Sequence, residues 1–153
     1  MKKYLKQFWI VLLAAAALLL AAAALRSASA GSDIQRTLRK TWDVELPGGY
    51  TVEYRAATAR NLDKGGLRFH ALLYDDWAVL DDLLPWIPCT LPTQNAGSGA
   101  EVAREILTAL NVPGGEWPDL EKAGMWYAAI DGAEVLLFHE QEDLRLYILE
   151  SVQ

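Results

Sequence analysis

Cysteine and histidine are scarce in this sequence, and their scarcity excludes several kinds of site. The single cysteine, Cys89, cannot form a disulfide within the chain, so the fold must be held together by its core. The two histidines, His70 and His139, fall on different predicted strands, whereas a zinc site needs three or four ligands. No H-E-x-x-H, C-x-x-C or H-x-H motif is present. We therefore predict neither a metal site nor a bound cofactor.

Motifs for nucleophilic catalysis and for phosphate binding are also missing. Ser98 has no G-x-S-x-G sequence around it, and its place before a helical pattern marks it as a helix cap. Gly97-Ser98-Gly99 lacks the lysine and the preceding strand of a phosphate-binding loop. Cys89 has apolar and proline neighbours, which favours a small buried side chain over a reactive thiolate. The sequence leaves enzymatic activity open and favours a non-enzymatic role.

Basic residues are few after the first thirty positions. Residues 31–153 hold all 20 acidic residues but only 10 of the 14 basic ones, which gives this part a net charge of −10. Nucleic acids and anionic lipid surfaces are bound through a basic footprint, so neither is a predicted partner. The negative charge keeps a domain soluble, and it is also compatible with a cationic partner.

One long apolar run dominates the amino-terminal region. Phe8–Leu25 contains eighteen residues without a charge, three lysines precede it, and Ala28-Ser29-Ala30 follows it. A basic start, an apolar middle and an A-x-A ending are the three parts of a secretory signal peptide, with cleavage here near Ala30. The same run forms about 27 Å of helix, which also suffices for a membrane anchor. The sequence thus predicts export and leaves open whether the run is cleaved.

Both interpretations give the same topology, with the lysines in the cytoplasm and the rest of the chain outside it. Residues 1–30 are a signal peptide or signal anchor with an apolar core at 8–25, and this core is the predicted contact with the membrane. Residues 31–46 are a stalk or short helix, which the Ser32-Asp33 pair can cap. Residues 47–153 are the extracytoplasmic domain. If the anchor is retained, Trp42 suits the membrane interface.

Five segments have the apolar patterns of β-strands. In the first, strict alternation puts Tyr50, Val52, Tyr54 and Ala56 on one predicted face. The first two strands are expected to form a hairpin, and Asp131-Gly132 is a strong cue for a second one. The predicted strands are Tyr50–Ala57, Leu67–Tyr74, Met125–Ile130, Ala133–His139 and Leu144–Glu150.

Two further segments have the periodicity of amphipathic helices. The first runs from about Trp77 to Leu84. The second starts at the capping box of Ser98 and Glu101 and continues to about Leu110. The element order ββααβββ predicts an α+β domain of two layers, with a mostly antiparallel five-stranded sheet and both helices on one face.

Two pairs of aspartates form the densest acidic cluster. Neighbouring carboxylates can act as acid and base on a glycan, or they can bind calcium. The spacing does not match an EF-hand loop. Helix capping explains the first pair and a solvated helix face explains the second, so we interpret the cluster as structural. Its members are Asp75, Asp76, Asp81 and Asp82.

Two tryptophans next to prolines are the strongest candidates for ligand binding. Trp86 and Trp117 both lie in predicted loops. A rigid loop indole can stack on a sugar or contact a peptide, and it can equally fold down to plug the open edge of a small core. The predicted ligand-binding residues are Trp86, Trp117, Glu116 and Asp119.

These features predict a small exported, non-catalytic domain that acts at the cell envelope by binding a protein or glycan. One rival is an envelope hydrolase that uses dispersed carboxylates, with His70 as a helper. Two carboxylates in one cleft, one of them with a raised pKa, would favour the hydrolase. The other rival is a membrane-anchored accessory subunit, which an uncovered apolar sheet face would favour.

Overall fold

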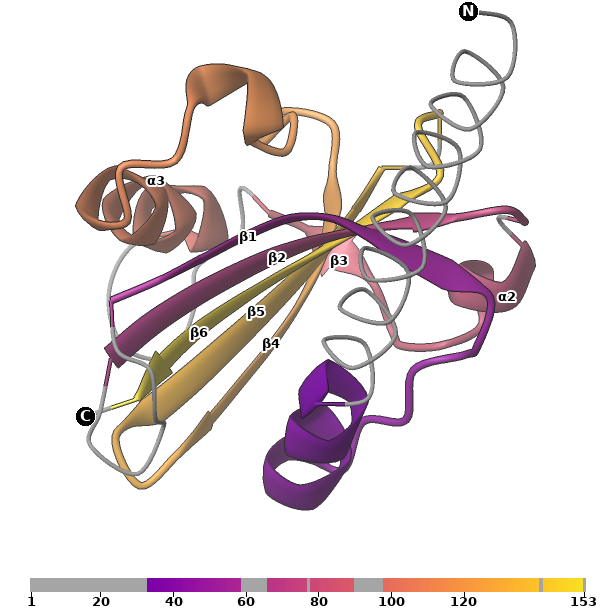
Figure 1. Ribbon diagram of the computed structural model, residues 1–153, viewed down its shortest axis with the longest axis horizontal. Coiled ribbons are helices and arrows are strands. Elements are labelled where there is room, and N and C mark those ends of the chain that lie inside the picture. Colours follow the sequence, from indigo (N-terminus) through magenta and orange to yellow (C-terminus); the bar gives the residue numbers. More distant parts are fainter. Residues whose placement is uncertain (1–32, 59–65, 77, 90–97, 141, 153) are drawn as a thin grey trace, which may run out of the picture.

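The computed structural model describes residues 33–58, 66–76, 78–89, 98–140 and 142–152. The apolar run Phe8–Leu25, the predicted cleavage site near Ala30 and Trp77 lie outside these residues. Within them, no helix combines the length and the apolar character that crossing a membrane requires. The described part of the chain has an α+β fold built on one open antiparallel sheet (Figure 1).

Six strands of the described chain form this sheet, in the order β1-β2-β6-β5-β4-β3. The predicted fold class is confirmed, and each predicted strand is present within two residues of its expected ends. The predicted count of five is wrong, because a two-residue edge strand forms in the proline-flanked segment. The strands are β1 (Tyr50–Ala57), β2 (Gly66–Tyr74), β3 (Ile87–Pro88), β4 (Gly124–Ile130), β5 (Ala133–Glu140) and β6 (Arg145–Val152).

Both predicted hairpins are present. β1 pairs antiparallel with β2, and β4 pairs antiparallel with β5. The turn between β4 and β5 holds Asp131 at φ 50° and Gly132 at φ 82°. Positive φ at both central residues is what a type I′ turn requires, and Asp-Gly is a sequence that accepts it.

The strand β1 departs from the predicted alternation at Glu53. Its pairing with β2 shifts register between Val52 and Tyr54, which marks a β-bulge. Tyr50 and Val52 consequently pack on one face of the sheet, while Tyr54 and Ala56 pack on the other. The prediction that these four side chains share a face is therefore wrong. The extra residue of the bulge moves every side chain that follows it to the other face of the sheet.

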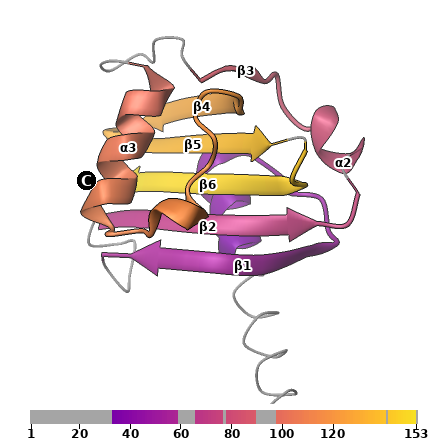
Figure 2. The same cartoon turned by 90° about the horizontal axis from the view of Figure 1, so that it is seen from above.

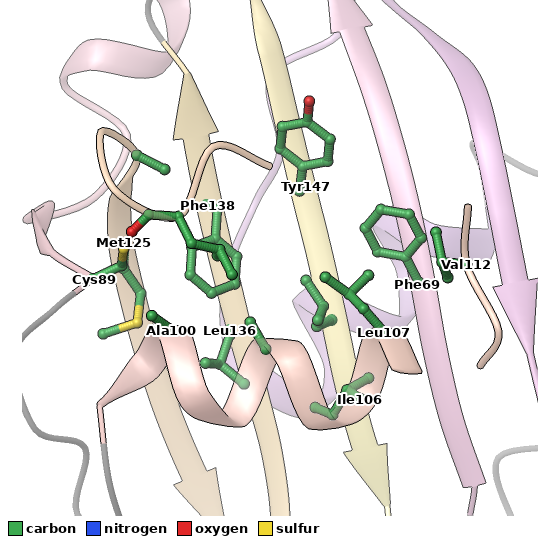
Figure 3. Close-up of a cluster of buried hydrophobic side chains, with 14 of the residues drawn as sticks. Phe69, Cys89, Ala100, Ile106, Leu107, Val112, Met125, Leu136, Phe138 and Tyr147 are labelled. Atoms are coloured by element: carbon green, nitrogen blue, oxygen red, sulfur yellow. Dashed lines mark hydrogen bonds between the residues drawn. The ribbon is translucent and has the colours of Figure 1, made fainter. Parts of the chain in front are cut away.

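Helical segments cover both faces of the sheet, so the domain has three layers (Figure 2). The helix α3 (Gly99–Ala109) lies on one face, and Ile106 and Leu107 pack there against strand residues such as Phe69 (Figure 3). The short α2 (Ala78–Asp81) contributes Leu80 to the core on the opposite face. The prediction of two layers with both helices on one face is thus wrong. The capping box of Ser98 and Glu101 is confirmed.

Residues 33–46 form the other part of the second helical layer. Residues 33–37 are α-helical and continue into a π-helical turn, η1 (Leu38–Trp42). The buried side chains of this segment belong to the same core as Leu80. A stalk or short helix was predicted here, and residues 33–42 are helical. Apolar side chains at these spacings need a surface to bury them, and the sheet provides it. The buried residues are Ile34, Leu38, Trp42, Val44 and Leu46.

Candidate functional site

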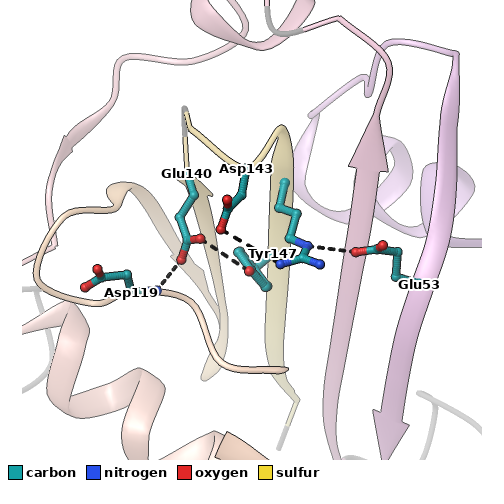
Figure 4. Close-up of polar contacts among 6 residues, drawn as sticks. Glu53, Asp119, Glu140, Asp143 and Tyr147 are labelled. Carbon is teal, nitrogen blue, oxygen red and sulfur yellow. Dashed lines mark hydrogen bonds and ion pairs between the residues drawn. The ribbon is translucent and has the colours of Figure 1, made fainter. Parts of the chain in front are cut away.

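A polar groove lies where the loop after α3 passes the turn between β5 and β6 (Figure 4). Two adjoining hollows of about 480 and 250 Å³ share Asp119, Glu140 and Asp143 in their walls. We call this region the acidic groove and define it by Trp117, Asp119, Glu140, Asp143, Arg145 and Tyr147. Its walls carry five carboxylates and three basic groups, the latter from Arg104, Lys122 and Arg145.

The Glu140 carboxylate connects the loop after α3 to the sheet through hydrogen bonds. Its Oε1 accepts a hydrogen bond from the backbone N–H of Asp119, and its Oε2 accepts one from the Tyr147 hydroxyl at 3.5 Å. Burial raises the pKa of Glu140, and the nearby carboxyl of Asp143 raises it further, while the Asp119 N–H opposes the shift. Burial also raises the pKa of Tyr147 to about 12, with the charge of Glu140 as a second cause.

The other charged groups of the groove also have partners in the protein. Asp119 Oδ1 accepts the Glu121 backbone N–H at 3.1 Å, and Asp119 Oδ2 lies 3.4 Å from Lys122 Nζ. Arg145 Nε donates to Glu53 Oε2 at 2.8 Å, and its Nη1 lies 3.9 Å from Asp143 Oδ2. The bond to Glu53 raises the pKa of Arg145. The groove is therefore held in shape by its own charged side chains.

The structure brings together only two of the four predicted ligand-binding residues. Trp117 and Asp119 line the acidic groove, and Glu116 ends the short helix η3 (Gly114–Glu116) just before them. Trp86 lies on the opposite face of the sheet, where its ring meets that of His139 edge-on at 4.5 Å. The two loop tryptophans therefore cannot contact one small ligand together.

Both loop indoles are half-buried and bonded to the backbone. Trp86 Nε1 donates to the Leu80 carbonyl at 3.0 Å, and Trp117 Nε1 donates to the Val112 carbonyl at 2.9 Å. Each ring packs against one of the two apolar cores. These contacts show that both rings close the edges of the apolar cores. Only the exposed part of the Trp117 ring is available to a ligand in the groove.

Three further groups of predicted residues lie outside the groove. Asp76 Oδ1 accepts the Ala78 N–H at 3.0 Å, and the side chains of the other three clustered aspartates are exposed. His70 and His139 belong to β2 and β5, with β6 between these strands. Cys89 is buried, and burial raises the pKa of its thiol. Where the structure describes the chain, no three His, Cys, Asp or Glu side chains are arranged to hold a metal ion.

Sequence reasoning missed the groove residues that come from the β5–β6 hairpin. Glu140 and Asp143 were visible only as the ends of a polar turn between two predicted strands, and Arg145 only as a residue of the strand that follows. Glu140 and Tyr147 point to the same face as Phe138, so strand alternation places them correctly once the register is known. Their meeting with Asp119 depends on the path of the loop after α3, which has no sequence signal of its own.

Comparison with models of protein families, with curated proteins and with solved structures finds no match for this chain. The function is therefore inferred from the residues and their contacts. An excess of carboxylates beside an exposed aromatic edge suits a ligand with cationic or hydrogen-bond-donating groups.

Proposed function

We propose that this protein is an exported, non-catalytic domain that acts at the cell envelope by binding a partner in the acidic groove. The observation that carries the proposal is the groove itself, a hollow with Trp117 in its wall and more carboxylates than basic groups. The apolar run Phe8–Leu25 with its preceding lysines supports export. The proposed partner is a protein segment with basic side chains, because both the groove and the exported part of the chain are acidic.

Binding is favoured over hydrolysis because the carboxylates are already in use. Both oxygens of Glu140 accept hydrogen bonds from the groove walls, and Asp119 is bonded to Glu121 and Lys122. A general acid must present its proton to the substrate. One observation nevertheless favours the hydrolase as a second candidate, namely the raised pKa of Glu140 beside Asp143.

The accessory-subunit alternative receives no support from the described residues. Helical segments cover both faces of the sheet. The large hydrophobic side chains that are exposed in the described ranges are Val79, Ile87 and Ile130, which come from three different elements. Scattered single side chains of this kind are normal on a soluble surface.

Charge removal in the groove tests the binding proposal. We expect the full chain in detergent to bind a fluorescent pentalysine peptide, and the double change Asp119→Asn with Asp143→Asn to weaken binding about tenfold. Asparagine keeps the acceptor that Asp119 offers to Glu121, so the loop is preserved. The matched control is Asp82→Asn with Asp131→Asn, which removes two exposed charges elsewhere. Fluorescence anisotropy gives both affinities.

Equal weakening in the control pair would show general charge attraction and would contradict a site in the groove. The hydrolase has its own signature. If the wild type released reducing ends from envelope glycans and Glu140→Gln abolished that release, catalysis would replace binding as the function of the groove.

Export is tested by protease protection. In spheroplasts of cells that produce the full chain, added protease is expected to digest residues 47–153 without detergent, while a cytoplasmic marker survives. The mass of the purified protein reports separately on cleavage, since a chain cut after Ala30 begins at Gly31. A protein protected until the membrane is dissolved would contradict the proposed location.

A further inference from the structure

A separate hollow lies on the opposite face of the sheet from the acidic groove. It has a volume of about 560 Å³ and lies between residues 33–37 and the strands β1, β2 and β6. We call it the arginine cavity and define it by Arg55, Arg68, His70 and Glu150. The hydroxyl-bearing residues Thr37 and Thr58 also line it. A volume of this size lies within the range of about 300–1,000 Å³ that small-molecule sites occupy.

Strand register brings the four side chains together. Arg55 of β1 is paired with His70 of β2, and Arg68 of β2 is paired with Glu150 of β6. The bulge at Glu53 is essential to this arrangement, because it turns Arg55 toward the face that Arg68 and His70 occupy. Without the bulge, Arg55 would lie on the face of α3.

Neither cavity arginine is committed to an ion pair among the described residues, although the charge of Arg68 acts on the Glu150 carboxyl of the paired strand. Ion pairs within the described ranges engage Arg39, Lys122 and Arg145 but neither Arg55 nor Arg68. A guanidinium presents a planar set of N–H donors that matches the oxygens of a carboxylate or phosphate. Two such groups beside one cavity make a place where an oxyanion can be held from two sides.

His70 adds an unsatisfied polar atom. Its Nδ1 is buried, and no hydrogen-bond partner for it is present in the described structure. Burial and the charges of Arg68 and Arg55 lower the pKa of His70 to about 4, so the ring is neutral at pH 7. A neutral imidazole has one donor and one acceptor nitrogen. A buried polar atom without a partner is costly, and a turn of the ring that presents this nitrogen to a ligand in the cavity would relieve that cost.

Two acidic groups restrict what the ligand can be. Glu150 Oε1 accepts the indole N–H of Trp42 at 3.1 Å, and Asp33 lines the cavity from the helical side. A ligand that is anionic throughout would meet these carboxylates, whereas one that also carries hydroxyl or amino groups can donate hydrogen bonds to them.

We propose that the arginine cavity binds a small molecule with one carboxylate or phosphate group, held by Arg55 and Arg68, and with hydroxyl or amino groups directed to His70 and Glu150. The cavity is independent of the acidic groove, since it lies on the other face and selects the opposite charge.

Calorimetric titration of the full chain in detergent tests the proposal, with glycerate and glycerol 3-phosphate as probes, each of which carries one oxyanion and two hydroxyl groups. At least one probe is expected to bind with one-to-one stoichiometry, and the tighter of the two identifies the preferred oxyanion. Arg55→Gln is expected to weaken that binding at least tenfold, because a charge-assisted contact is lost. The matched control is Arg39→Gln, which removes an exposed guanidinium outside the cavity.

Arg55 is exposed, so its replacement leaves the fold intact, which circular dichroism checks. Arg68→Gln is the second variant, with the same expected loss of affinity. The proposal is overturned if neither probe binds the folded wild type. It is also overturned if Arg55→Gln binds as tightly as the wild type, or if Arg39→Gln weakens binding equally.

Discussion

Replacing Trp42 with alanine is expected to lower the free energy of unfolding by at least about 3–5 kcal/mol. The Trp42 side chain is 5% exposed and belongs to the core between residues 33–46 and the sheet. Its removal leaves a large cavity, and it also takes away the donor to Glu150, a residue only 3% exposed. A domain is stable by about 5–15 kcal/mol, so this single change removes a large share.

Urea unfolding followed by circular dichroism measures this loss of stability. A second variant separates the contribution of packing from that of the hydrogen bond. Trp42→Phe keeps most of the packing and removes the indole N–H, so a loss of about 1–3 kcal/mol is expected from the hydrogen bond to a carboxylate. Thr41→Ala, at an exposed position in the same turn, is the control and should change stability by less than about 0.5 kcal/mol. Unchanged stability in Trp42→Ala would mean that residues 33–46 are a stalk after all.

Between pH 6.5 and pH 4, the wild type is expected to lose up to about 3 kcal/mol of stability through His70 alone. The folded protein holds the pKa of this group at about 4, against the ordinary value of 6.5. On acidification the unfolded chain therefore takes up a proton first, which favours unfolding. The loss begins near pH 6.5 and is complete near pH 4. In His70→Gln this contribution disappears.

Glu150 has the opposite effect in the same cavity. Burial raises its pKa, so the folded protein takes up this proton before the unfolded chain does, and acidification through the folded pKa adds stability. Urea midpoints of the wild type, His70→Gln, Glu150→Gln and the double variant at each pH separate the two groups. The pKa of His139 is also lowered by burial, but His139 is present in all four proteins and cancels in the differences. Parallel pH curves for the wild type and His70→Gln would refute the assignment.

The elements of this fold were predictable because their signals are local. Alternating side chains located β1 and β2, and Asp131-Gly132 located the tight turn between β4 and β5. Ser98 and Glu101 marked the start of α3 through a capping box that spans four residues. Each of these patterns depends on neighbours in the sequence, and each located its element correctly, although the alternation of β1 assigned Tyr54 and Ala56 to the wrong face.

What could not be predicted depends on contacts between distant residues. The bulge at Glu53 is defined by pairing with β2, and nothing in the alternation of β1 reveals it. Residues 33–46 were interpreted as a stalk or short helix, and their sequence did not show that a face of the sheet would bury their apolar side chains. The error in the number of layers follows directly from that gap.

The same limit applies to the two sites. Trp117 and Asp119 were selected from the sequence and do line the acidic groove, but Trp86 lies on the other face. Arg55 was assigned by alternation to the side opposite Tyr50, and the bulge moves it to the arginine cavity. Residue types therefore indicated useful chemistry, while the register and the loop path decided which residues meet.

The position of β6 has a consequence for how the chain folds. In the described sheet, the β1–β2 hairpin and the β4–β5 hairpin are joined only through β6, which follows both of them in the sequence. Neither hairpin can acquire its central neighbour until residues 145–152 have been synthesised, and the pairing of Gly66 with Val152 closes a very long loop. Such non-local pairing slows folding. Under the proposed export, this delay keeps the chain open while it is threaded through the membrane and lets the sheet close once it is outside.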